Sequence, residues 1–190
     1  MTQWLQFPLS EAATFHQTNA DDRHYHHPRE HSVVSRIDYC NAVLAGVHDV
    51  HLRQLQAVLN AAARLIVRKR KYDSISATIR DVVHWLPIRQ RVEFKLCVLV
   101  FNSLHNLAPN YLSTMCQSVA ENPSCRYLRS AARGDLAVPL TRTTRYGPRS
   151  FAVAGPSTWN SLPAPLRNCQ PSSSFRHELK SELFARAYLC

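Results

Sequence analysis

Residues 84–104, HWLPIRQRVEFKLCVLVFNSL, decide the fold of this 190-residue chain. Pro87 lies where a first-turn proline is tolerated, so we predict a long helix over residues 88–104. The second half of this helix is apolar nearly all round, which is typical of a helix buried in a core. Its first half carries Arg89, Arg91 and Lys95. We therefore expect a buried end and a separate charged end.

A second helical pattern precedes this stretch. Its apolar residues recur three or four positions apart and predict one buried face: Leu52, Leu55, Leu59, Ala62 and Ile66. At about 100° per residue, the opposite face carries Arg53, Asn60, Arg64 and Lys71. We expect Arg68, Lys69 and Arg70 to crowd the last turn, where cations suit the helix dipole. A brief helix through Val83 should follow, capped by Asp73 or Ser74.

The chain divides into three predicted parts. Residues 1–34 are rich in histidine and slightly acidic, so we expect a poorly ordered tail. Residues 35–116 predict a small helical bundle of four or five helices. Residues 117–190 predict an irregular segment rich in arginine and proline, with one helical turn at 159–162 and a short terminal helix. The fold class is therefore mainly α. The terminal helix carries on one side Phe175, Leu179, Leu183 and Phe184.

Positive charge is clustered along the chain. There are 23 Lys and Arg against 13 Asp and Glu, giving a net charge of +10. The clusters fall in residues 64–95 and 126–149, whereas residues 96–125 contain no Lys or Arg. Such clusters are typical of proteins that meet nucleic acid or an anionic membrane surface. The alternative is a solvated helix face that keeps the protein soluble.

The sequence also excludes several classes. Its apolar runs are too short to span a membrane, so we expect no membrane partner. The N-terminus has no signal-peptide pattern, which predicts an intracellular protein, nuclear or cytoplasmic. The run Arg68-Lys69-Arg70-Lys71 could serve as a nuclear import signal. The six cysteines are scattered, so neither a disulfide framework nor a zinc site is predicted.

Two groups of cations are candidate nucleic-acid contacts. Cations that neutralise phosphates give affinity without reading the base sequence. Tyr146 and Phe151 lie near the second group and could stack on bases, although both could instead belong to the core. The first group is Arg53, Arg64, Arg68, Lys69, Arg70 and Lys71, and the second is Arg142, Arg145 and Arg149.

Catalytic and metal motifs are weak by comparison. The paired aspartates in NADD at 19–22 follow no strand pattern, although two-metal chemistry needs carboxylates that converge from separate elements. The histidines at 24, 26, 27 and 31 suit a transition metal, but polar tail is the favoured interpretation. His48 and His51 could share a ligand, but a solvent-exposed helix start explains them more simply. We expect no catalytic residue, metal or cofactor.

Several short segments of the sequence resemble, in the same order along the chain, the C-terminal part of reverse transcriptases of LINE-type, non-LTR retrotransposons. The resemblance covers residues 35–184. It rests on SRIDYCN at 35–41, LQAVLNAAARL at 55–65, HWLPIRQR at 84–91, LHNLAP at 104–109, TRTTRYG at 141–147, FAVAGP at 151–156, WNSLP at 159–163 and SFRHELKSELF at 174–184.

This resemblance implies the thumb and the segment after it, which grip the template–primer duplex. It implies that the cations at 64 and 68–71 contact an RNA–DNA hybrid, RNA or DNA. The family's palm carboxylates and endonuclease are missing from these strings, so the expected function is non-catalytic binding. Two alternatives stay open. One is a protein-interaction module whose apolar surface has lost its natural neighbour, and the other is a translated element fragment without function.

Overall fold

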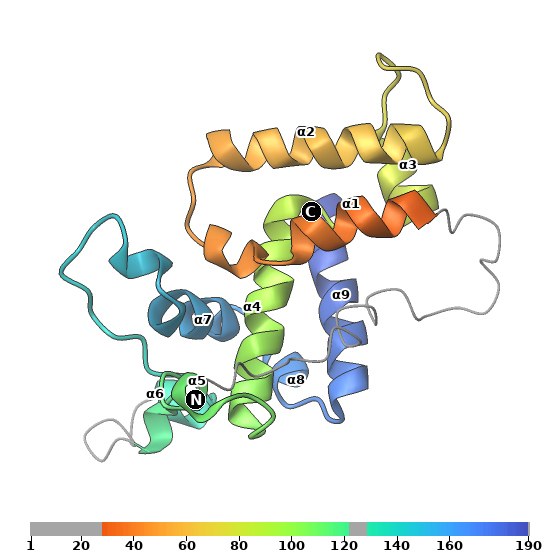
Figure 1. The fold of residues 1–190 in the computed structure, drawn as a ribbon. Helices are drawn as coiled ribbons and strands as arrows, with labels where there is room; N and C mark the ends of the chain where they lie inside the picture. Colours follow the sequence, from red (N-terminus) through yellow and green to blue (C-terminus); the bar gives the residue numbers. More distant parts are fainter. Residues whose placement is uncertain (1–27, 122–128, 190) are drawn as a thin grey trace, which may run out of the picture.

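The computed structural model describes residues 28–121 and 129–189 (Figure 1). These residues are mainly helical, as predicted, and within them the only β-type pairing is an isolated bridge between Ser118 and Leu136. The α-helices are α1 (Pro28–Asp38), α2 (Asp49–Ile66), α3 (Ser76–Thr78), α4 (Ile88–Leu104), α5 (Asn110–Ser113), α6 (Arg129–Ala132), α7 (Phe151–Asn160), α8 (Ala164–Arg167) and α9 (Ser172–Tyr188). Short 3₁₀ helices are η2 (Asn41–Leu44), η4 (Val119–Glu121) and η5 (Gly147–Arg149), and η3 (Ile79–Val83) is a π-helix.

Helix α4 is the centre of the fold, as its apolar second half predicts. It packs against η2, α2, α5, α7 and α9, and Figure 1 shows α7 and α9 on different sides of it. Phe101 of α4 stacks on Phe175 of α9 with ring centroids 4.3 Å apart, and on His105 with centroids 4.0 Å apart. A helix with neighbours on several sides needs apolar residues all round, which explains its composition.

One hydrophobic core crosses the predicted boundary at residue 116. Leu86, Val100 and Phe101 lie in the same buried cluster as Trp159 and Leu179. The prediction of a single helical turn at 159–162 was wrong, because α7 begins at Phe151. Gly155 permits this packing, since a Cβ there would lie 3.1 Å from Val100 Cγ2. The terminal helix has 17 residues and buries Phe175, Leu179 and Leu183, the face predicted for it.

Helix α1 begins at Pro28, inside the predicted tail. Residues 28–34 are helical, and Val34 is buried with Leu59, Ala63 and Trp85 in a second cluster. The prediction of a poorly ordered tail was therefore wrong for residues 28–34. This part of α1 is ordered because Val34 packs against apolar side chains of α2 and of the 84–87 segment. The remainder of that prediction, residues 1–27, lies outside the described residues.

Arg91 does not lie in a charged end of α4, as the sequence analysis expected. Its side chain is 2% exposed, and its Nη1 lies 2.7 Å from Asp38 Oδ2. Its Nε donates to the Leu86 carbonyl at 2.8 Å, and its Cζ lies 5.7 Å from the Trp85 ring centroid. The guanidinium therefore joins α1, the 84–87 segment and α4.

The extended segment 135–140 is held to α7 and α8 by polar contacts. Asn160 accepts from the Leu136 N–H at 2.8 Å and donates to the Leu136 carbonyl at 2.9 Å, as a neighbouring strand would. Asp135 lies 2.8 Å from Arg167 Nη1 and 2.8 Å from Arg133 Nη2. Burial alone would raise the pKa of Asp135, but hydrogen bonds from Arg167 and Arg133 hold that pKa below its ordinary value.

Among residues 28–121 and 129–189, no helix combines the length and the apolar character that crossing a membrane requires.

Asp38→Ala should destabilise the protein by about 3 kcal/mol, because it leaves a buried guanidinium without its carboxylate. Chemical denaturation of the variant and the wild type measures this difference. Asp81→Ala is the matched control, since the Arg80–Asp81 pair is exposed and its loss should not measurably change stability. Equal stability of the two variants would contradict the role given to Arg91.

Asn160→Ala should cost about 2–4 kcal/mol, because it removes hydrogen bonds from both backbone groups of the buried Leu136. Thermal melting followed by circular dichroism would report this loss. Asn168→Ala, at an exposed position after α8, serves as the control and should melt like the wild type. An unchanged melting temperature in Asn160→Ala would show that water replaces both bonds.

Candidate nucleic-acid interface

Helix α2 ends before most of the predicted cations. The Lys69 N–H donates to the Arg64 carbonyl at 2.9 Å and the Arg68 N–H to the Leu65 carbonyl at 3.4 Å. Arg68 has a φ of 53°, in the left-handed region. This is a Schellman ending, in which the left-handed position is more often glycine. The prediction that Arg68, Lys69 and Arg70 crowd the last helical turn was therefore wrong.

The loop that follows is held together by its own side chains. Asp73 Oδ2 accepts from the Arg70 N–H at 2.9 Å, and Arg64 Nε donates to the Asp73 carbonyl at 3.2 Å. Lys69 Nζ donates to Thr78 Oγ1 at 2.6 Å. Two predicted phosphate contacts, Arg64 and Lys69, thus anchor the loop. Asp73 closes this loop instead of capping the next helix, which has no side-chain cap.

Four exposed side chains remain on what we call the basic loop, residues 68–72. Arg68, Arg70 and Lys71 are exposed, and within the described part of the chain their side chains have no ion pair. Tyr72 is 90% exposed, and Lys71 Nζ lies 5.6 Å from the centroid of its ring. The loop therefore offers three cations and one aromatic ring to solvent from a backbone that hydrogen bonds hold in place.

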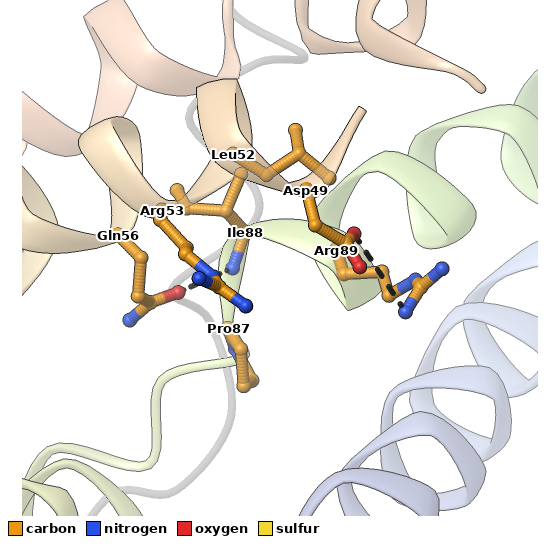
Figure 2. Close-up of a pocket in the computed structure, with 7 residues that line it drawn as sticks. All are labelled: Asp49, Leu52, Arg53, Gln56, Pro87, Ile88 and Arg89. Atoms are coloured by element: carbon orange, nitrogen blue, oxygen red, sulfur yellow. Dashed lines mark hydrogen bonds and ion pairs between the residues drawn. The ribbon is translucent and has the colours of Figure 1, made fainter. Parts of the chain in front are cut away.

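Arg53 lies elsewhere, in the first half of α2. It lines a shallow groove of about 180 Å³ between α2 and the start of α4. Figure 2 shows its side chain extending toward Pro87 and Ile88. Arg89 also lines this groove, with Nη1 3.9 Å from Asp49 Oδ1. Sequence reasoning did not select Arg89 as a contact, because its position near Arg53 depends on how the two helices pack.

The groove's polar groups also serve the fold. Gln56 Oε1 accepts the Ile88 N–H at 2.9 Å, so a side chain of α2 caps the first turn of α4. Figure 2 shows this bond beneath Arg53. Because the Gln56 bond caps the start of α4, we interpret the groove as part of the packing between α2 and α4. Arg53 and Arg89 lie at its rim.

The second predicted group, Arg142, Arg145 and Arg149, also contains both exposed cations and a cation that anchors the fold. Arg142 and Arg145 are exposed on the irregular segment 137–146. Arg149 instead donates from Nε to the Ala45 carbonyl at 3.3 Å and packs its side chain against Gly46. The aromatic residues beside them separate as well: Tyr146 is exposed, whereas Phe151 packs against the core.

The two groups do not form one surface. In Figure 1 the basic loop lies beyond the C-terminal end of α2, and segment 137–146 lies on the opposite side of the view. Arg53 lies near the N-terminal end of α2, so most of the length of this helix separates it from the basic loop. The structure therefore gives three basic positions: the basic loop, Arg53 with Arg89, and Arg142 with Arg145.

The metal predictions fall partly outside the described residues. The histidines at 24, 26 and 27 and the NADD string lie there. His48 is the residue before α2, and His51 donates its backbone N–H to the His48 carbonyl at 3.0 Å. Across the described ranges, no three His, Cys, Asp or Glu side chains are grouped so that they could hold a metal ion.

Comparison with known proteins assigns the chain to no family. No family model matches the chain, and no curated protein or solved structure matches it.

Lys69→Met should loosen the loop without changing the rest of the fold, because Thr78 and Ser74 lose their bonds to the ammonium. We expect a loss of about 1 kcal/mol and faster amide hydrogen exchange at residues 69–75. Lys71→Met is the control, since that side chain holds no other residue of the loop by a hydrogen bond within the described chain. If the amides of residues 69–75 exchange at the same rate in both variants, Lys69 does not anchor the loop and is again a candidate phosphate contact.

Proposed function

We propose that the chain is a non-catalytic nucleic-acid-binding protein that holds phosphates with its basic loop. The observation that carries this proposal is the loop itself. Arg68, Arg70 and Lys71 are exposed together, while Arg64 and Lys69 are used to hold the backbone that presents them. Cations presented on an ordered loop lose less conformational freedom on binding than cations on a loose one.

The chemistry of this loop favours the backbone of a nucleic acid over its base edges. Its three cations can each neutralise a phosphate and release condensed counterions. Tyr72 adds an exposed ring that can stack on an unpaired base or cover a sugar. The loop lacks Asn or Gln side chains, which read adenine edges in pairs of hydrogen bonds. Arg and Lys can read guanine edges, but the proposal assigns those of the basic loop to phosphates, so it includes no sequence preference.

The type of nucleic acid is proposed from the resemblance to the reverse transcriptase thumb. A thumb grips the duplex of template and primer, so an RNA–DNA hybrid is the first ligand to test. Arg53 is a further candidate contact on α2, and Arg142 and Arg145 are candidates for a separate stretch of the same strand. Arg64, Lys69 and Arg149 are assigned to the fold and support binding only by positioning their loops.

The triple variant Arg68→Gln, Arg70→Gln, Lys71→Gln tests the proposal. We expect the wild-type chain to bind a labelled RNA–DNA hybrid less tightly as salt rises from about 50 to 200 mM. In the triple variant the slope of log affinity against log salt should become shallower by about two to three, because that number of phosphate contacts is lost. Fluorescence anisotropy at several salt concentrations measures both quantities.

The matched control removes the same charge elsewhere, with Arg36→Gln, Lys95→Gln and Arg129→Gln. These cations lie on α1, α4 and α6, and none forms an ion pair within the described residues, so net charge falls equally while the basic loop stays intact. The control should keep the wild-type slope. If the control and the triple variant lose affinity alike, binding depends on net charge alone and the loop is not its site. Parallel titrations with RNA and with duplex DNA rank the three ligands.

A further inference from the structure

Helix α2 exposes an apolar stripe on the side turned away from the core. Its buried face is formed by Leu59, Ala62 and Ala63. Three larger apolar residues of the same helix are exposed, with Val50 at 54%, Val58 at 51% and Leu65 at 81%. Two exposed alanines complete what we call the α2 stripe: Val50, Ala57, Val58, Ala61 and Leu65.

The α2 stripe runs along the helix with one polar interruption, the exposed Gln54 between Val50 and Ala57. At 3.6 residues per turn its five side chains fall within about 100° of each other and extend over about 22 Å of helix axis. Figure 1 shows α2 at one edge of the molecule, with α1 and α4 below it and no described element above it. The sequence analysis placed cations directly opposite the buried face. The stripe occupies that place, and Arg53 and Arg64 border it.

The centre of the stripe suits close contact with another helix. Ala57 and Ala61 are one turn apart, with Val58 beside them and the larger Val50 and Leu65 toward the ends. Helix axes approach to about 8 Å where the contact residues are small. Apolar side chains grouped on one exposed helix face are typical of protein-contact sites.

Charge selects the kind of partner. Arg53 and Arg64 lie along one edge of the α2 stripe, and Arg64 keeps its charge although its Nε donates to the Asp73 carbonyl. Helix α2 has a single acidic residue, Asp49, in its first turn. A second copy of α2 packed antiparallel would bring Arg53 of one chain near Arg64 of the other, which opposes like charges. A parallel copy related by a two-fold axis would place the arginine edge against the opposite edge of the stripe, where α2 has no acidic residue. A helix with acidic residues along the matching edge would instead pair with both arginines.

We propose that the α2 stripe is a docking surface for an amphipathic helix of another protein, whose apolar face is bordered by Glu or Asp. This surface is separate from the basic loop, and the inference goes beyond the proposed binding of nucleic acid. The partner helix buries Val50, Val58 and Leu65, and its carboxylates face Arg53 and Arg64.

The test uses the full chain and two synthetic helical peptides of about 18 residues, or five turns. Both carry the same leucine stripe. One has Glu at every position bordering the stripe and the other has Lys there. Anisotropy of the labelled peptides gives their affinities. We expect the Glu peptide to bind at least about ten-fold more tightly than the Lys peptide, because only the Glu peptide complements Arg53 and Arg64.

Two protein variants locate the binding. Val58→Ser with Leu65→Ser should weaken the Glu peptide by about ten-fold or more, since two apolar contacts are lost. Val82→Ser with Val138→Ser removes exposed valines elsewhere, at 53% and 42% exposure, and should bind like the wild type. Arg53→Glu should reduce the preference for the Glu peptide. The triple Gln variant of the basic loop should keep its affinity for the Glu peptide.

Several results would overturn the inference. They are equal binding of the Glu and Lys peptides, equal loss in the two serine variants, and no binding of either peptide. Sedimentation of the free chain adds another: a dimer that Val58→Ser with Leu65→Ser dissociates would assign the stripe to a second copy. Full displacement of the Glu peptide by the RNA–DNA hybrid would assign it to the nucleic-acid surface instead.

Discussion

The buried guanidinium of Arg91 is the interaction on which the arrangement of the N-terminal helices depends. It pairs with Asp38 at the end of α1 and donates to the Leu86 carbonyl. A charge removed from water is tolerated only when it is paired and hydrogen-bonded, so these groups must meet whenever α4 is buried. Trp85 lies over the same guanidinium, and Tyr188 of α9 donates its hydroxyl proton to the Trp85 carbonyl at 2.9 Å. Through these contacts α1, α4 and the end of α9 take up one arrangement.

That arrangement sets what α2 can present to a ligand. Leu59 and Ala63 pack with Trp85 and Val34, so the opposite side of α2 is directed to solvent. Its Schellman ending then places Arg68 and the residues after it on a loop. The proposed nucleic-acid surface and the proposed partner surface are thus consecutive along the chain, on the loop after α2 and on α2 itself, with Leu65 three residues before Arg68. A helix bound on the stripe would border a nucleic acid bound on the loop.

The cations of this chain have two kinds of role. Arg64, Lys69 and Arg149 donate to backbone or hydroxyl oxygens of other segments, and Arg91 and Arg167 are buried in ion pairs. The charge available to a ligand is therefore smaller than the composition suggests. It is concentrated where the structure leaves side chains exposed: at the basic loop, at Arg53 with Arg89, and at Arg142 with Arg145. For this reason a binding test needs variants matched in net charge.

The amino-acid sequence was sufficient to predict the mainly helical class, the central position of α4 and the buried faces of α2 and α9. These features follow from apolar periodicity, which acts within a few turns of one helix. It missed α7, because Gly155 and Pro156 disfavour a helix that close packing on α4 stabilises. It located the clusters of cations but not which members anchor a loop, since the partners of Lys69 and Arg149 lie 9 and 104 residues away. Only the tertiary structure brings those groups together, and it alone decides which side of α2 has no neighbour.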